Sequence, residues 1–465
     1  MNYYSHLADY LSLDASQLAD SSLTCPKCGI EHQIPFKIVR SGDNLIGMLP
    51  ETIKLILGKT PDHLGVVYDR HIEEKLDDLF FAPFSSLGLS FSHIPLGNHG
   101  ELLDAGVEIG DQAATELPKE IDFLIGVGSG VISDLTKWIA TKCKLPFLLM
   151  GTAASMNAYT SITATMTENN VKTSKWLDPA SAIFLDSALL ASAPLAMTWA
   201  GIGDILARNI SNVDWKLANI LRGTYFCPVP FQMMSSYQEK VMLQAAALGK
   251  NNKSAMKDLA DAILVSGYSM TVLNGETSPS SGSEHVISHF FDFQHEVFGL
   301  PKNLHGTQVG IGTIIMRAAY EILRGFTPAD FDIQKIIQTR PSLDSIKADH
   351  HRLFGTYGAA FSQVVEAKRI SEDEIEPYLR NILENWDEMW GALNPYLLPA
   401  GTVRSAMEKA GGVTKLTGIQ RTHNDAIQAL LYGSHYRSRY TILDLFWELG
   451  LFPEVADEIL ERAGV

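Results

Sequence analysis

Three histidines and one aspartate are the residues of this chain whose types and spacing best suit metal chemistry. His285 and His289 stand four residues apart in the run Ser-Gly-Ser-Glu-His-Val-Ile-Ser-His, so a helix would place both on one face. His305 follows in front of a glycine, and Asp204 ends the run Trp-Ala-Gly-Ile-Gly-Asp. One carboxylate with two or three imidazoles suits a divalent ion that keeps an open position, which is typical of catalytic sites. Histidines with this spacing also occur as ordinary surface or core residues of a helix.

A glycine turn provides a second candidate site. The apolar run Phe-Leu-Ile leads into Gly126, Gly128 and Gly130, after which the pattern turns helical through Asp134 and Lys137. A strand, a glycine turn and a helix N-terminus together bind phosphate, because backbone N–H groups can approach the anion. A side chain at Gly128 is therefore expected to block the anion by steric intrusion alone. The spacing is G-x-G-x-G rather than G-x-G-x-x-G, and similar turns also merely connect a strand to a helix.

The elements that must position these residues follow from hydrophobic periodicity. Strands alternate with helices in the first part of the chain, which predicts a parallel, doubly wound sheet. The expected strands cover 63–68, 89–94, 122–127, 146–150 and 182–185, and helices are expected over 48–57 and 131–141. A hairpin is expected from 163–167 to 171–175 around the turn Glu168-Asn169-Asn170, and residues 1–20 read as a short helix and a loop.

Beyond about residue 190 the periodicity becomes helical. Helices are expected over 194–218, 232–249, 254–271, 284–298 and 307–323, and in the C-terminal third. We therefore predict an α/β nucleotide-binding domain over 1–190 and an all-α metal and substrate domain over 191–465. The active site is expected in the cleft between the two domains, where such pockets usually occur.

Composition indicates a water-soluble enzyme. The 465 residues are 46% hydrophobic and 19% charged, which is ordinary for a globular chain. The net charge of −16 disfavours nucleic acid or an anionic membrane as a partner. The N-terminus does not read as a signal peptide, and no apolar stretch reaches spanning length, so membrane insertion is not expected. Four cysteines in such a chain are typical of a reducing compartment, which predicts a cytoplasmic location.

Cys25-Pro-Lys-Cys28-Gly29 forms a C-x-x-C knuckle, which is half of a zinc ribbon, and His32 could be a third ligand. A second C-x-x-C motif does not follow, and Cys143 and Cys227 are far away in the sequence. The pattern therefore favours a small turn without a metal.

Taken together and in this order, these motifs resemble those of the iron-type, metal-dependent alcohol dehydrogenases. Within that superfamily, which also includes the dehydroquinate synthases, the chain is similar to the bacterial branch of the sn-glycerol-1-phosphate dehydrogenases. The matching segments are Gly126–Lys137, Thr152–Ser161, Gly203–Arg208 with Asp214–Trp215, Ser281–His289, Leu304–Gly306 and Arg437–Leu445.

The resemblance implies a metal-dependent NAD(H) or NADP(H) oxidoreductase that reduces dihydroxyacetone phosphate to sn-glycerol 1-phosphate. Asp204, His285 and His305 match the metal ligands of the family, for one Zn²⁺ or Ni²⁺ ion with Fe²⁺ as an alternative. His289, Asp204 and Asn157 match its catalytic and substrate-contacting positions. The implied partner is a small phosphorylated polyol or ketone, and the implied assembly is a homo-oligomer, a dimer or larger.

The resemblance also implies a set of cofactor-binding residues. Asp69 ends a predicted strand and suits the ribose 2′-hydroxyl of NAD, although a helix N-cap is an equally good interpretation. NADP is not excluded, because the neighbouring Arg70 could accept a 2′-phosphate. The remaining predicted cofactor residues are Gly128, Ser129, Gly130, Val131 and Ile132 at the pyrophosphate, with Asp134, Thr152, Ser155 and Ser161.

One departure from the family pattern concerns the substrate. Asn157 and Ala158 stand where relatives usually have Asp and Gly, and an amide replaces one acceptor by donors. A related dehydrogenase for another polyol or polyol phosphate therefore stays open. So do a dehydroquinate-synthase-like lyase, which uses NAD only catalytically, and a non-catalytic protein that binds metal and nucleotide.

Overall fold

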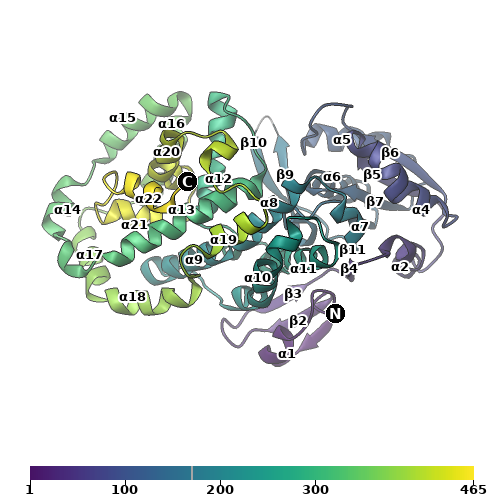
Figure 1. Cartoon of the computed structure of the whole chain (residues 1–465), viewed down its shortest axis with the longest axis horizontal. Coiled ribbons are helices and arrows are strands. Elements are labelled where there is room, and N and C mark those ends of the chain that lie inside the picture. Colours follow the sequence, from purple (N-terminus) through teal and green to yellow (C-terminus); the bar gives the residue numbers. More distant parts are fainter. Residues whose placement is uncertain (169–170) are drawn as a thin grey trace. The chain divides into compact units, whose positions relative to one another are not determined.

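The computed structural model describes residues 1–168 and 171–465 (Figure 1). It consists of two compact units, of which the first comprises Met1–Ile205 with Pro228–Thr277 and the second comprises Leu206–Cys227 with Ser278–Val465. This division differs from the predicted boundary after residue 190, because α11 (Lys253–Thr271) packs on α7 (Ser187–Ala191) and on strands of the first unit. The assignment of nucleotide binding to 1–190 and of metal binding to 191–465 stays a prediction.

A six-stranded sheet is the core of the first unit, with the strand order β4-β11-β8-β7-β5-β6. All its pairings are parallel, so the predicted doubly wound α/β fold is confirmed. The strands are β4 (Ile38–Gly42), β5 (Leu64–Asp69), β6 (Phe91–Leu96), β7 (Phe123–Gly128), β8 (Phe147–Gly151) and β11 (Ala182–Asp186). Every residue of β7, β8 and β11 is buried, which explains why these strands are continuous apolar runs without alternation.

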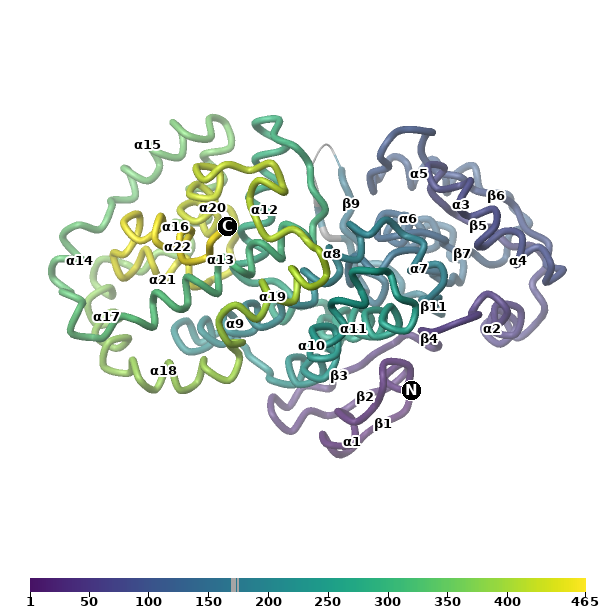
Figure 2. The backbone as a smooth tube through the Cα atoms, viewed as in Figure 1, coloured from purple at the N-terminus to yellow at the C-terminus, as the bar shows by residue number. Residues whose placement is uncertain are grey.

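Helices cover both faces of this sheet. Successive residues of a strand point to opposite faces, and Ile125 and Val127 join a core with Ile53 of α2 (Leu49–Leu57) and Phe84 of α4 (Ala82–Ser85). Gly126 lies on the other face, against Thr136 of α6 (Gly130–Cys143). The course of the backbone through these strands and helices can be followed in Figure 2. The other helices of this unit are α1 (Leu7–Leu11), α3 (Glu73–Leu76), α5 (Val107–Glu116), α8 (Leu195–Leu206) and α10 (Val229–Leu248).

The strand order places a topological switch between β5 and β7. From β5 the chain moves outward to β6, whereas β7, β8 and β11 succeed one another in the opposite direction. Ligands of open α/β sheets bind outside the carboxyl ends of the strands at such a switch. Here those ends are Asp69 and Gly128.

A second, smaller sheet lies at the N-terminus, where β1 (Asn2–Tyr4), β2 (Ser21–Thr24) and β3 (Glu31–Ile34) pair in that order. The expectation of only a helix and a loop over 1–20 is wrong for β1, because three residues are too few to show periodicity. The hairpin β9 (Thr163–Glu168) and β10 (Val171–Trp176) is antiparallel as predicted. Its turn residues Asn169 and Asn170 lie outside the described residues.

The second unit is mostly helical, as predicted. Its longest helices are α12 (Ser283–Phe298) and α13 (His305–Gly325), and α12 packs on α13, α9 and α20. The remaining helices are α9 (Arg208–Arg222), α14 (Ile333–Thr339), α15 (Leu343–Phe354), α16 (Gly358–Lys368), α17 (Ile375–Glu384), α18 (Trp386–Leu393), α19 (Thr402–Lys409), α20 (His423–Tyr436), α21 (Ile442–Glu448) and α22 (Ala456–Ala463).

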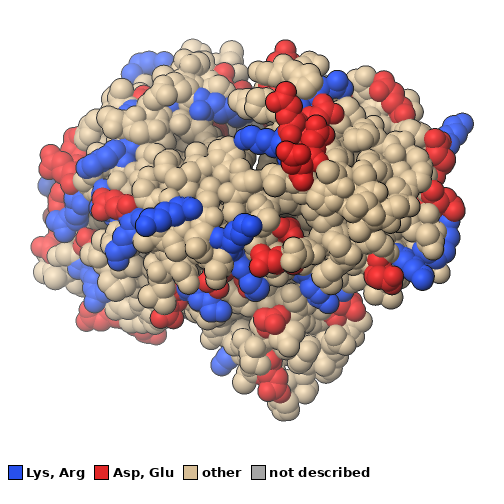
Figure 3. Space-filling view, turned by 45° about the vertical axis from the view of Figure 1, so that its right-hand side comes forward, with Lys and Arg blue, Asp and Glu red and all other residues tan. Residues whose placement is uncertain are grey.

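The described helices do not include one with both the length and the apolar character needed to cross a bilayer. On the face shown in Figure 3, basic and acidic side chains are interspersed among a larger area of uncharged residues.

Two buried histidines pack together in the second unit. His350 Nε2 lies 3.0 Å from His435 Nδ1, and His350 Nδ1 lies 3.0 Å from the hydroxyl of Ser362. Burial, followed by the nearby charges of His350 and Lys368, holds the pKa of His435 well below its usual range. Burial also lowers the pKa of His350. Burial therefore favours the neutral form of both rings in the folded protein.

This pair should make the protein less stable in mild acid. A histidine whose pKa is lowered by folding adds stability above its unfolded pKa, and this stability is lost as the pH falls towards the folded pKa, by up to about 1.4 kcal/mol per pH unit. We expect His435→Gln to flatten the fall of the thermal midpoint between about pH 7 and about pH 5. The exposed His423, which lies 2.7 Å from Asp457 Oδ1, provides the control His423→Gln. If the thermal midpoint falls equally steeply with pH in the wild type and in both variants, His435 is not the group that destabilises the protein in acid.

Candidate metal centre and nucleotide site

The structure brings Asp204, His285 and His305 together. Asp204 lies near the end of α8 (Leu195–Leu206), His285 lies in the first turn of α12, and His305 begins α13. Each residue offers one ligand atom, and these atoms all lie within 4.8 Å of one another. Asp204 and His285 are buried, and His305 is partly exposed. A carboxylate and two imidazoles fit Zn²⁺, Ni²⁺ or Fe²⁺, and three protein ligands leave a coordination position open.

His289 lies beside the two histidine ligands. Its ring centroid is 5.6 Å from that of His305 and 6.1 Å from that of His285, and the two ligand rings are 5.1 Å apart. Asp292 Oδ2 lies 3.9 Å from His289 Nδ1. The helical spacing of His285 and His289 therefore has the predicted effect of placing both on one face.

Glu284 is a further candidate residue of the metal centre, which the sequence motifs did not single out. Its side chain is fully buried, and Oε1 lies 2.7 Å from His285 Nδ1 and accepts a hydrogen bond of 2.9 Å from the N–H of Gly282. A histidine that donates from Nδ1 to a carboxylate directs its Nε2 lone pair towards a metal and is the more basic ligand for it. The sequence Ser-Glu-His indicates this contact, because a carboxylate next to a candidate histidine ligand is a typical hydrogen-bond partner of its second ring nitrogen.

Asp214 anchors the same helix start. Its Oδ2 accepts a 2.6 Å hydrogen bond from the N–H of Ser283, and its Oδ1 accepts one of 2.6 Å from the hydroxyl of Tyr320. Burial, followed by the charge of Glu284, raises the pKa of Asp214 to about 7. A Cβ at Gly282 would lie 2.7 Å from Asp214 Oδ2, so only glycine allows this approach.

The glycine turn lies at the carboxyl end of β7, where the sequence predicted it. β7 ends at Gly128, Ser129 is the N-cap of α6, and α6 begins with Gly130, Val131 and Ile132. The first N–H groups of a helix have no intrahelical acceptor, so they are suited to binding a phosphate.

The expectation for a side chain at Gly128 is corrected by the structure. A Cβ there would lie 2.5 Å from Cβ of Ile132, and a Cβ at Gly126 would lie 2.4 Å from Oγ1 of Thr136. These glycines therefore let α6 pack closely on the sheet, and Gly128→Val would displace the helix before it could obstruct any ligand.

Asp134 has a packing role that the sequence did not reveal. It is buried in α6, accepts a hydrogen bond of 3.1 Å from the N–H of Thr165, and lies 3.5 Å from Nζ of the buried Lys137. Lys137 donates to the carbonyl oxygens of Ala158 (2.6 Å) and Thr163 (3.3 Å). Burial raises the pKa of Asp134 and lowers the pKa of Lys137. The pair ties α6 to β9, and a cofactor contact of Asp134 stays a prediction.

The remaining predicted cofactor residues surround the carboxyl edge of the sheet. The Asp69 carboxylate accepts a hydrogen bond of 2.9 Å from the N–H of His71, which is the N-cap role that the sequence left open. The Thr152 N–H donates to the carbonyl of Gly128 at 3.1 Å. Ser155 and Ser161 are buried in the segment that follows β8. Their contacts with a nucleotide stay predictions.

Asn157 lies in the same segment, immediately before a short 3₁₀ turn. Its Nδ2 donates a hydrogen bond of 3.0 Å to the hydroxyl of Ser266 on α11. Close packing against Gly267 holds the segment there, because a Cβ at Gly267 would lie 2.6 Å from the carbonyl oxygen of Asn157. The side chain is only partly buried, so part of it stays accessible.

Known proteins resemble this chain in both sequence and fold. The profile of iron-containing alcohol dehydrogenases matches residues 41–194. The glycerol-1-phosphate dehydrogenase (NAD(P)+) of Halalkalibacterium halodurans is 31% identical over 297 residues, which are 63% of this chain and 73% of that relative. The one of Bacillus licheniformis is 27% identical over 451 residues, which are 95% of this chain and 96% of that relative.

A solved structure shares the fold. The crystal structure of glycerol dehydrogenase from Schizosaccharomyces pombe superimposes with a TM-score of 0.55 at 15% sequence identity, covering 92% of this chain and 91% of that chain.

Removal of the Glu284 charge should weaken the metal centre. We expect Glu284→Gln to lower the affinity of this site for its divalent ion about 10- to 100-fold, because the neutral amide orients and polarises the His285 ring less strongly. Removal of the ligand itself, in His285→Ala, should reduce the bound metal by one ion per chain. Chelator competition followed by metal analysis measures both effects. Glu296→Gln, on the exposed side of the same helix, is the matched control. If Glu284→Gln retains metal as well as Glu296→Gln does, Glu284 has no role in the site.

Proposed function

This chain belongs to the glycerol-1-phosphate dehydrogenases within the iron-containing alcohol dehydrogenases, and from that membership we propose its reaction. It reversibly reduces dihydroxyacetone phosphate to sn-glycerol 1-phosphate, with NADH or NADPH as the reductant and uptake of one proton. The observation that carries the proposal is the grouping of one carboxylate and two imidazoles, Asp204, His285 and His305, within 4.8 Å in a chain with these relatives.

Asp204, His285 and His305 hold one divalent ion in this proposal, Zn²⁺, Ni²⁺ or Fe²⁺. When bound, such an ion acts as a Lewis acid towards the substrate carbonyl. Glu284 fixes the tautomer of His285, so that Nε2 is the ligand atom. His289 exchanges the proton with the substrate oxygen, and the Asp292 carboxylate, 3.9 Å from its Nδ1, favours the protonated form of the ring electrostatically. Asn157 contributes a substrate contact through its side-chain amide.

The glycine turn and the start of α6 hold the dinucleotide. When bound, the nicotinamide supplies or accepts the hydride. The N–H groups of Gly130, Val131 and Ile132 bind its pyrophosphate. Asp69 accepts the N-cap hydrogen bond through Oδ1, and it contacts the ribose through its other carboxylate oxygen, Oδ2. A carboxylate at this position favours NADH, because it repels the 2′-phosphate of NADPH.

We further propose that the enzyme acts in the cytoplasm as a homo-oligomer. The cytoplasmic location is supported by the presence of only four cysteines in 465 residues. The oligomeric assembly rests on the family resemblance, and light scattering of the purified enzyme would measure it.

Asn157 supports a second candidate, a dehydrogenase for another polyol or polyol phosphate. The amide offers one acceptor where a carboxylate offers two, so a substrate with a different pattern of hydroxyls would suit it better. The chemistry of reduction and the roles of the metal ligands are the same for both candidates.

The reaction can be tested by its stoichiometry. Metal-loaded enzyme with excess dihydroxyacetone phosphate should consume one NADH for each sn-glycerol 1-phosphate formed, and chiral analysis should find only that enantiomer. A lyase that recycles its hydride would use NAD catalytically and consume no net NADH. Product formation without NADH loss, or formation of the opposite enantiomer, would overturn the proposal.

Position 157 tests the identity of the substrate. We expect Asn157→Asp to raise kcat/KM for dihydroxyacetone phosphate by about ten- to a hundredfold, because a mismatched polar contact in a dry pocket costs about 1–3 kcal/mol. Ser266→Ala is the control, since it removes the hydrogen bond of Asn157 without changing the amide. If Asn157→Asp instead lowers every activity of the wild type, the pocket is built around the amide, and the second candidate replaces the first.

A further inference from the structure

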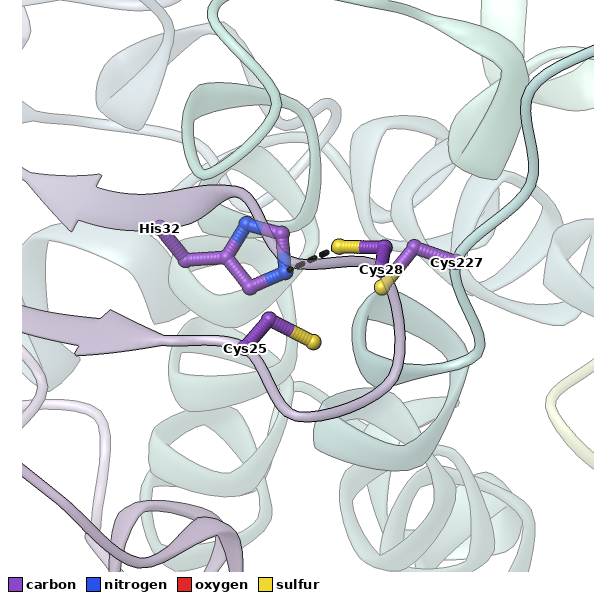
Figure 4. Close-up of side chains that lie close together, drawn as sticks. All are labelled: Cys25, Cys28, His32 and Cys227. Carbon is purple, nitrogen blue, oxygen red and sulfur yellow. Dashed lines mark hydrogen bonds between the residues drawn. The ribbon is translucent and has the colours of Figure 1, made fainter.

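Cys25, Cys28, His32 and Cys227 lie together, with their side chains directed towards one another (Figure 4). Each offers one ligand atom, and the four atoms all lie within 4.8 Å of one another. Three of the four side chains, those of Cys25, His32 and Cys227, are at most 1% exposed. We propose that these residues bind a structural zinc ion with Cys₃His coordination, a site separate from the metal centre of the proposed reaction.

The loop between β2 and β3 has the local geometry of a zinc knuckle. The N–H of Gly29 donates to the carbonyl of Cys25 and the N–H of Cys25 donates to the carbonyl of Ile30, each at 2.9 Å, so the loop is a closed turn. The N–H of Lys27 points at Cys25 Sγ, 3.4 Å away. An N–H group directed at sulfur stabilises the thiolate form, which is the form that binds metal.

His32 is oriented as a metal ligand. Its Nδ1 lies 2.9 Å from the carbonyl oxygen of Val272, and since a carbonyl can only accept, Nδ1 carries the proton. The lone pair is then on Nε2, which faces Cys28 Sγ at 3.6 Å. For a tetrahedral zinc ion with ordinary Zn–S and Zn–N bonds, the sulfur and nitrogen ligands lie about 3.6 Å apart. A backbone carbonyl on the far ring nitrogen is also the usual support of a histidine ligand.

Cys227 completes the set. It directly precedes Pro228, the N-cap of α10, and its side chain is fully buried. Its great sequence distance from the knuckle is why the pattern of cysteines favoured a turn without metal, and the tertiary structure removes that objection. The fourth cysteine of the chain, Cys143, lies elsewhere, with its sulfur 3.6 Å from the carbonyl of Ala114.

The donor set identifies the ion and its role. Three thiolates and one imidazole favour zinc over the harder ions that carboxylates bind. Four protein ligands close the tetrahedron, so the ion holds structure and has no position for a substrate. Three thiolates buried without a cation would be strongly unfavourable, whereas the metal balances their charge. The ion would thus fasten the N-terminal sheet to the connection between α9 and α10.

Metal analysis of the full-length protein tests this site independently of activity. Protein with the substitution His285→Ala, which removes the other metal centre, should still contain one zinc per chain. The double variant His285→Ala with Cys227→Ser should contain no zinc, whereas the matched control, His285→Ala with Cys143→Ser, should still contain one zinc per chain. Absence of zinc from the His285→Ala protein, or retention of zinc after Cys227→Ser, would overturn the proposal. An inactive protein that behaves as expected in this assay would count against the proposed reaction and not against this site.

Two measurements keep the test decisive if Cys227→Ser does not fold. His32→Cys should keep one zinc per chain, because a fourth thiolate preserves the coordination although the ring packing is lost. In the wild-type protein, Cys25, Cys28 and Cys227 should resist alkylation until a strong chelator is added, while the labelling of Cys143 should not respond to it. If all four cysteines are labelled equally with and without the chelator, the cluster consists of bare thiols. If fewer than four thiols react after denaturation, the cluster contains a disulfide. Either result would overturn the proposal.

Discussion

The buried carboxylate of Asp214 is the interaction on which the arrangement of the second unit depends. Oδ1 accepts hydrogen bonds from the Tyr320 hydroxyl and, at 2.9 Å, from the N–H of Ile442, and Oδ2 accepts one from the N–H of Ser283. These donors belong to α13, α21 and α12, whereas Asp214 belongs to α9. A buried carboxylate costs several kcal/mol unless its oxygens are satisfied, so four helices must converge for this residue to be tolerated. The first turn of α12, which carries His285, is thereby held in place.

The two candidate metal-binding clusters are built on different chemical principles. Asp204, His285 and His305 are three hard or borderline ligands, and a set of three leaves room for a substrate oxygen. The cysteine cluster has four ligands and sulfur donors, which together exclude a substrate. One histidine of each cluster is fixed through its Nδ1 atom: His285 by the carboxylate of Glu284 in the first, and His32 by the carbonyl of Val272 in the second.

In the first unit the glycines of the strand-to-helix turn allow close packing of α6 on the sheet. The absence of side chains at Gly126 and Gly128 lets α6 lie directly on β7, and this close contact brings the start of α6 to the topological switch of the sheet. The buried pair Asp134 and Lys137 then ties the segment around Ala158 and Thr163 to the same helix. The glycine turn and the segment that carries Asn157 are therefore both in contact with α6.

The sequence alone determined the features that depend on short-range patterns. Continuous apolar runs predicted the buried parallel strands, the glycine turn predicted the strand-to-helix connection, and the spacing of His285 and His289 placed both rings on one face. Resemblance to known motifs added Asp204 and His305, which no local spacing could have joined to His285. The same kind of reasoning missed β1, since a three-residue strand has no period to detect.

Only the tertiary structure decided which distant groups share a site. It brought Cys227 to the Cys25 knuckle, and it placed the Asp134 carboxylate in the buried packing between α6 and the N–H of Thr165. The physical reason is that periodicity records which face of an element is buried, whereas the partner of a buried polar group is chosen by the way separate elements pack.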